Sequence, residues 1–341
     1  MSELRWNPIL RQWVVTASHR QSRTYKPPEE HCPLCPTKEG GFPTEIPAPH
    51  YEIAVFDNKF PSFRNAPEEP VVAGTPLMPV RPSLGRCEVV LYTDDHMSSL
   101  SRMPVERIRD LVDVWADRYG DLCAEQGIEY VMIFENRGDA VGVTLHHPHG
   151  QIYAFPFIPP IPMAELKRSS EHLTSTGRCL LCDVLAEEMA DGRRVVYANQ
   201  HFAAVVPFHA RWPYEVHIIA REHVPSIAAL PAEQRWELAL ALSAVARAYD
   251  SLFGFDLPYV MVMHQAPTDP AYLPVSHFHI EFYPPNRTAD KLKYLAGCEL
   301  GAGVFINDSH PEEKAAELRA CVSKLEGQSC GPADGGGEVG S

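Results

Sequence analysis

The sequence predicts an α+β protein made of two related halves, each a mostly antiparallel sheet with helices packed on it. One order of motifs occurs twice: a C-x-x-C pair, strands, a histidine, a long helix, a strand and an H-x-H strand. The segment CEVVLYTDDH at 87–96 resembles YEVHIIAREH at 214–223. A repeat of this length indicates a duplicated structural unit. Strands that lie close together in the sequence favour antiparallel pairing.

Each half contains one segment that is predicted to form a long helix. Each segment begins at a proline, Pro104 or Pro231, which is a favoured residue in the first helical turn. Apolar residues then recur at helical spacing; they are Val105, Ile108, Val112, Trp115, Tyr119 and Leu122 in the first half, and Leu238, Leu242, Val245, Tyr249 and Leu252 in the second. A strand is expected after each helix, at 130–138 and at 259–267, and the H-x-H strand follows it.

The repeat also sets the expected boundaries of the two halves. The first half is placed at 1–166 and the second at 167–326. Residues 158–176 are expected to connect them, beginning with the proline-rich IPPIP. The tail at 327–341 is rich in glycine and polar residues, so we expect it to be disordered.

Composition excludes several classes of function. The formal net charge of −14 argues against a nucleic-acid partner, because phosphate backbones are bound by basic surfaces. No apolar stretch is long enough to cross a bilayer, so no membrane association is expected. The first residues lack the apolar core of a secretory signal. We therefore expect a cytoplasmic protein.

Cysteines and histidines predict two metal sites. The nine cysteines are an odd number and include two C-x-x-C pairs, which favours metal binding over disulfides. Zinc in closed sites takes four nitrogen or sulfur ligands, and C-x-x-C commonly supplies two of them. The repeat supplies two histidines to each pair. The predicted sets are Cys32, Cys35, His96 and His147, and Cys179, Cys182, His223 and His277.

The run His147-Pro148-His149-Gly150-Gln151 predicts a nucleophile beside the first metal set. In an extended strand residues 147, 149 and 151 point to one face. A neutral imidazole can attack phosphorus and divide one transfer into two steps. We therefore expect His149 to be the nucleophile and Gln151 to donate hydrogen bonds to the phosphoryl oxygens. An amide cannot protonate a poor leaving group, which favours exchange of sugar phosphates over phosphoramidate hydrolysis.

These motifs resemble the galactose-1-phosphate uridylyltransferase family of the histidine-triad superfamily. The resemblance spans residues 5–325 and is carried by FENRG at 134–138, GVTLHHPHGQIYA at 142–154 and HFHIEFYPP at 277–285. It implies two fused histidine-triad-like halves and a homodimer. It also implies ping-pong transfer of UMP from UDP-glucose to galactose 1-phosphate through a uridylylated histidine.

The resemblance implies further site residues. Those expected to bind substrate are Arg20, Arg23, Asn58, Lys59, Asn136, Gly142, Val143, Thr144, Gln151, Lys293 and Tyr294. It also implies another second metal set, which could hold iron: Glu165, His264, His277 and His279. Because His277 belongs to both second sets, we expect only one of them to form. We favour the cysteine set and therefore two zinc ions per chain, since thiolates at repeated positions suit zinc.

Two other functions fit the sequence. A related phosphorylase or adenylyltransferase that acts on ADP-glucose or another nucleotide sugar would also carry two Cys-containing zinc sites. A non-catalytic, zinc-stabilised nucleotide-binding module would share the metal sites without turnover. In the second half, Glu281 stands where the repeat places Gln151, and a carboxylate repels phosphate. We therefore expect the second half to lack a phosphate-transfer site of its own.

Overall fold

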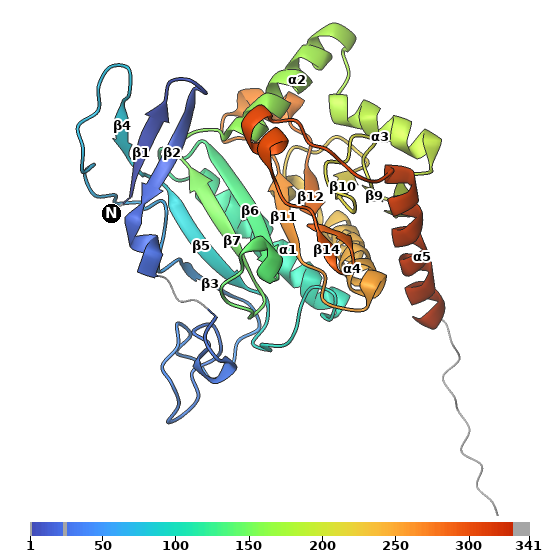
Figure 1. Cartoon of the computed structure of the whole chain (residues 1–341), viewed down its shortest axis with the longest axis horizontal. Coiled ribbons are helices and arrows are strands. Elements are labelled where there is room, and N and C mark those ends of the chain that lie inside the picture. Colours follow the sequence, from blue (N-terminus) through green and yellow to red (C-terminus); the bar gives the residue numbers. More distant parts are fainter. Residues whose placement is uncertain (1, 23–25, 330–341) are drawn as a thin grey trace, which may run out of the picture.

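One antiparallel sheet runs through the whole molecule (Figure 1). The computed structural model describes residues 2–22 and 26–329 of the chain. Within them a nine-stranded sheet has the order β3-β5-β7-β6-β11-β12-β10-β9-β8. The strands are β3 (Ala54–Asp57), β5 (Arg86–Leu91), β6 (Tyr130–Arg137), β7 (His149–Phe155), β8 (Val195–Ala198), β9 (Phe202–Val205), β10 (Val216–Ala220), β11 (Tyr259–His264) and β12 (His279–Tyr283).

The strand order repeats about the centre of this sheet. Strands β3, β5, β7 and β6 of the first half correspond in order to β9, β10, β12 and β11 of the second half, and β8 extends the far edge. The halves join where β6 pairs with β11, with Met261 opposite Glu135. The α+β class and its duplication are confirmed. The halves share one sheet, however, whereas the sequence led us to expect a sheet in each.

Two long helices cover one face of the sheet. They are α1 (Val105–Cys123) and α4 (Ala232–Phe253), which pack against each other, and α5 (Pro311–Ser329) packs on α4 and β8. Buried side chains of both halves form one large core here, including Trp115, Tyr249 and Phe282. The predicted helical stripes of α1 and α4 therefore face this core. Helix α5 includes the first residues of the tail predicted to be disordered, and residues 330–341 lie outside the described part.

The opposite face carries the two C-x-x-C segments. Cys32 packs in a small apolar cluster with Leu34, Val89 and Leu91. In the second half the C-x-x-C pair lies at the start of α3 (Leu180–Asp191), beyond α2 (Pro160–Thr176). Most of the segment predicted as a connector is thus the helix α2, and the boundary that we expected near 166 falls inside it.

Smaller elements flank the main sheet. A three-stranded sheet of order β2-β1-β4 is built from β1 (Ser2–Asn7), β2 (Gln12–Ala17) and β4 (Val80–Pro82). A short hairpin pairs β13 (Asn286–Thr288) with β14 (Lys291–Leu292). None of the helices in the described residues is both long and apolar enough to cross a membrane.

Candidate active site and metal clusters

The first cysteine and histidine set comes together just before the start of β7. Ligand atoms of Cys32, Cys35, His96 and His147 all lie within 4.8 Å of one another. Cys35 Sγ is 3.4 Å from His96 Nδ1 and 3.5 Å from His147 Nδ1. On its other side, His147 Nε2 lies 2.8 Å from the Thr93 carbonyl oxygen. Donation from Nε2 to this carbonyl fixes the tautomer that turns the Nδ1 lone pair toward the cysteines.

The protonation states of this cluster suit a bound cation. Burial lowers the pKa of His147 to about 4, so the imidazole is neutral and its lone pair is available. Burial, together with the neighbouring Cys32, raises the pKa of Cys35 to about 12. A thiol in this environment keeps its proton until a metal replaces it. Two sulfur and two imidazole donors at this spacing match tetrahedral zinc.

The second set assembles in the same way. Cys179, Cys182, His223 and His277 also place ligand atoms within 4.8 Å of one another. His277 Nδ1 lies 3.4 Å from Cys179 Sγ and 3.5 Å from Cys182 Sγ. His277 Nε2 lies 2.8 Å from the Ala220 carbonyl oxygen, as His147 Nε2 does from Thr93. The two halves thus share the orientation of the His147 and His277 rings as well as the types of ligand.

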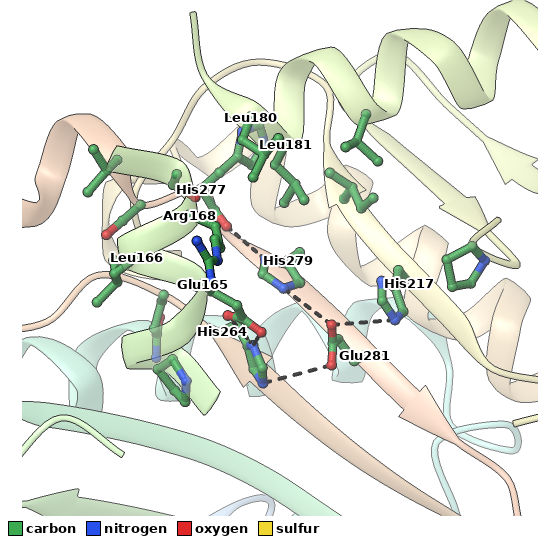
Figure 2. A pocket seen from close by; sticks show the side chains of 18 of the residues that line it. Glu165, Leu166, Arg168, Leu180, Leu181, His217, His264, His277, His279 and Glu281 are labelled. Carbon is green, nitrogen blue, oxygen red and sulfur yellow. Dashed lines mark hydrogen bonds and ion pairs between the residues drawn. The ribbon is translucent and has the colours of Figure 1, made fainter. Parts of the chain in front are cut away.

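A third cluster lies beside the second set, in a cavity of about 350 Å³ in the second half (Figure 2). Its ligand atoms belong to Glu165, His264, His279 and Glu281. Glu165 reaches His264 Nδ1 from α2 at 2.8 Å. Glu281 replaces His277 in this group, so the expected competition for His277 does not arise. Both groups can form at once.

His279, which lines this cavity, occupies the repeat position of His149. The charge of the residue two positions further along the strand differs between the two halves. Glu281 lies opposite His217 in the β10–β12 ladder, whereas Gln151 lies opposite Val89 in the β5–β7 ladder. Burial alone would raise the pKa of Glu281, but His217 and His264 outweigh it and hold the pKa well below its usual range. An ionised carboxylate therefore occupies the position of the amide. A carboxylate at that position favours cations over phosphate.

His149, the predicted nucleophile, is the first residue of β7. Its Nδ1 lies 2.7 Å from the carbonyl oxygen of His147. Donation from Nδ1 leaves the lone pair on Nε2 free. Burial lowers the pKa of His149, which keeps the ring neutral near pH 7. The backbone of the metal-cluster residue His147 thus orients the reactive ring.

Two cavities, each of about 250 Å³, meet at His149. The first is also lined by Arg20, Asn58, Lys59, Thr144 and Gln151. Asn58 Nδ2 donates to Gln151 Oε1 at 3.1 Å, which leaves the amide hydrogens of Gln151 available to a ligand. The second cavity includes the predicted residues Asn136 and Val143. Gly142 ends the turn before β7 at a φ of 81°, a left-handed conformation that suits glycine.

The structure holds Arg20 and Lys59 through specific partners. The Arg20 guanidinium donates to the Phe60 carbonyl, the Ser62 hydroxyl and the Tyr153 hydroxyl at 2.9–3.1 Å. Lys59 forms an exposed ion pair with Glu45 at 2.8 Å. Arg20 is therefore rigid, and Lys59 can exchange its partner at little cost.

Among the described residues, the predicted substrate contacts Gly142, Lys293 and Tyr294 do not line the cavities beside His149. Lys293 is buried and its ammonium group lies 3.3 Å from the Glu299 carboxylate. Tyr294 is 72% exposed. Neither lines the cavities beside His149. Arg23 lies outside the described residues.

Sequence reasoning missed four charged residues of the second cavity, Arg102, Glu135, Arg137 and Asp256. Arg102 lies in a loop without a motif. Glu135 lies inside FENRG, and this motif was the only signal that could have found it. A charged residue in a strand ordinarily indicates an exposed face, but Glu135 is 5% exposed.

Comparison with known proteins assigns both halves to one class of transferase. Residues 1–159 match the model of the N-terminal domain of galactose-1-phosphate uridyl transferase, and residues 165–328 match that of its C-terminal domain. The galactose-1-phosphate uridylyltransferase of Thermotoga maritima is 42% identical over 94% of this chain and 98% of its own length. The probable enzyme of Drosophila melanogaster is 34% identical over 94% and 95%.

Solved structures agree with this assignment. A uridylyltransferase structure has a TM-score of 0.83 and 33% sequence identity, covering 95% of this chain and 99% of that chain. An ADP-glucose phosphorylase from Arabidopsis thaliana, with a TM-score of 0.70 and 24% identity over 94% and 99%, shares the fold. The chain belongs to the galactose-1-phosphate uridylyltransferase family.

Proposed function

We propose that the protein transfers UMP from UDP-glucose to galactose 1-phosphate, with His149 as the covalent carrier. The observation that carries this proposal is the neutral His149 ring, whose Nδ1 is held by the His147 carbonyl where two cavities meet. Family membership, with similarity to named uridylyltransferases along nearly the whole chain, supports the same reaction.

Two displacements complete the reaction. His149 Nε2 attacks the uridine-bound phosphorus of UDP-glucose, the P–N bond forms, and glucose 1-phosphate leaves with the bridging oxygen. Its phosphate is a stable anion and needs no proton from an acid. A phosphate oxygen of galactose 1-phosphate then attacks the same phosphorus, and the P–N bond breaks to give UDP-galactose. The Gln151 amide and the Arg20 guanidinium are suited to stabilise the phosphoryl oxygens.

The donor groups support zinc at both cysteine-containing clusters. Zinc there would hold strand ends in place, since four protein ligands leave no position for a reacting group. The third cluster, with two imidazoles and two carboxylates, suits iron. Free thiols in both zinc clusters support a reducing, cytoplasmic location.

We also propose a homodimer. Exposed apolar side chains on the β1–β2 hairpin and the nearby loop support an interface there: Ile9, Leu10, Val71, Leu77 and Met78. Light scattering of the eluting protein should give twice the chain mass of 38.1 kDa. A monomer at micromolar concentration would refute this assembly.

Trapping the covalent intermediate tests the reaction. Incubation with UDP-glucose labelled at the α-phosphorus, without acceptor, should leave stoichiometric label on the protein. Galactose 1-phosphate should then discharge the label as UDP-galactose. Labelling by ADP-glucose in place of UDP-glucose would favour the adenylyltransferase or phosphorylase reading, and labelling by neither would favour the non-catalytic binding module.

A further inference from the structure

The strand that carries His149 rests on a buried tyrosine. Gly150 lies between His149 and Gln151, and a Cβ at this position would overlap the Tyr92 hydroxyl oxygen. The same Cβ would come within 3.1 Å of the Phe134 carbonyl oxygen. The Tyr92 backbone amide also donates to the Pro148 carbonyl at 3.2 Å. Tyr92 therefore contacts the residue before His149 and the residue after it.

Glu135 holds Tyr92 in this place. One Glu135 carboxylate oxygen accepts from the Tyr92 hydroxyl at 3.2 Å, and the other accepts from the Tyr259 hydroxyl at 3.2 Å. Both tyrosines are fully buried. Tyr92 belongs to the helix-covered core, as does Tyr259, whereas His149 and Gln151 line cavities on the other face. Tyr92 therefore supports β7 from the face opposite the His149 side chain, and Glu135, which also lines the second cavity beside His149, holds Tyr92 there.

Burying a carboxylate costs free energy, so the groups that contact Glu135 indicate what its role is. The two oxygens of one carboxylate let Glu135 accept a hydrogen bond from each hydroxyl. Burial raises the pKa of Glu135 to about 7, against the opposing effects of Arg137 and of the two tyrosines. The charged groups facing it are Arg137 and Asp250, which form their own ion pair at 2.7 Å. Glu135 therefore accepts hydrogen bonds from both tyrosine hydroxyls and also faces the positive charge of Arg137.

We propose that Tyr92 and Glu135 are positioning residues that fix β7 at Gly150, and so set the distance of His149 Nε2 from its phosphorus target and from the Gln151 amide. Tyr259 belongs to β11, so the second half supports the nucleophile of the first half through Glu135. This inference rests on the proposed function, because it assigns the two residues to the step in which His149 attacks. An attacking atom displaced by about 1 Å can cost about a hundredfold in rate.

Single-turnover kinetics of nucleotidylation by UDP-glucose test the proposal. Tyr92→Phe removes the hydroxyl behind Gly150 and should slow adduct formation about tenfold, with the dissociation constant of UDP-glucose within twofold of wild type. Glu135→Gln should slow it similarly. Tyr259→Phe is the matched control, since it removes one hydrogen bond from Glu135 without touching Gly150, and should slow the step less than threefold. Equal rates in wild type and Tyr92→Phe, or equal slowing in both Tyr→Phe variants, would overturn the assignment.

A second experiment does not depend on activity. Gly150→Ala drives a methyl group into the Tyr92 hydroxyl, and Tyr92→Phe removes that oxygen. The double variant should therefore regain part of the melting temperature lost in Gly150→Ala, although the Phe134 carbonyl still limits the space. If the melting temperatures lost in the two single variants add up in the double variant, the contact between Gly150 and the Tyr92 hydroxyl is contradicted. If wild type forms no adduct while this coupling is present, the proposed function fails and the contact stands; if wild type reacts and Tyr92→Phe reacts equally fast, only the positioning role fails.

Discussion

At the scale of single residues, burial shifts the pKa values of His149 and Glu135 in opposite directions. Burial lowers the pKa of His149 and keeps its ring neutral. Burial raises the pKa of Glu135 to about 7, so this carboxylate titrates near neutrality. The alternation of HPHGQ predicted that His149 and Gln151 share a cavity, and they line the same one. No pattern predicted Glu135, since its role depends on Tyr92 and Tyr259, which are distant in the sequence.

Replacing Glu135 should change how stability depends on pH. The folded-state pKa of about 7 lies above the ordinary value of 4.5, so the folded state binds the proton more tightly. The free energy of unfolding of the wild type should therefore fall by up to about 3 kcal/mol, through this group, as the pH rises from about 4.5 to about 7. Glu135→Gln cannot titrate and lacks this loss. Its stability relative to wild type, measured by urea unfolding, should rise between pH 5 and pH 8; a difference independent of pH would contradict the prediction.

At the scale of elements, each H-x-H strand links a metal cluster to a cavity. His147 and His277 lie two residues before β7 and β12, and in each ring one nitrogen faces cysteines and the other a backbone carbonyl. The repeat predicted this arrangement because both halves place Cys, Cys, His and His in one order. It could not predict that Glu165 would reach His264, because that contact depends on the helix α2 folding back over the sheet. Lys293 lies outside the cavities beside His149, and its loop packs on itself through Glu299.

Disrupting the first cluster should destabilise β7. Cys32→Ser removes a buried thiolate ligand, and metal binding contributes directly to folding free energy. We expect about one zinc fewer per chain and a lower melting temperature. Cys298→Ser is the matched control, because Cys298 is exposed and outside the clusters. Unchanged zinc content in Cys32→Ser would refute the ligand assignment.

At the scale of the whole molecule, one sheet couples the two halves. Strands β6 and β11 pair at its centre, and a single core lies beneath both halves. Duplication predicted the halves and their helices, but not their edge-to-edge pairing, because either half could have closed its own sheet. The charge difference between Gln151 and Glu281 was visible in the sequence. This difference makes the first half suited to bind phosphate and the second half suited to bind a cation.

Metal analysis should resolve the three clusters. Because His277 lies with the cysteines and Glu281 with Glu165, the second and third clusters are independent. Wild type should contain two zinc ions per chain at the cysteine clusters. Cys179→Ser should lower this number to one, whereas Glu281→Gln should leave it at two. Loss of zinc in Glu281→Gln, or its retention in Cys179→Ser, would contradict this division.

The central claim is that the His149 ring becomes covalently uridylylated during turnover. Mass spectrometry of peptides from protein incubated with UDP-glucose tests it most directly, with His149→Asn as the comparison. The account predicts that wild type gains the mass of UMP on the peptide at His149. The variant should gain none and lose turnover while keeping its zinc. UMP attached to another residue, or normal turnover in His149→Asn, would contradict it.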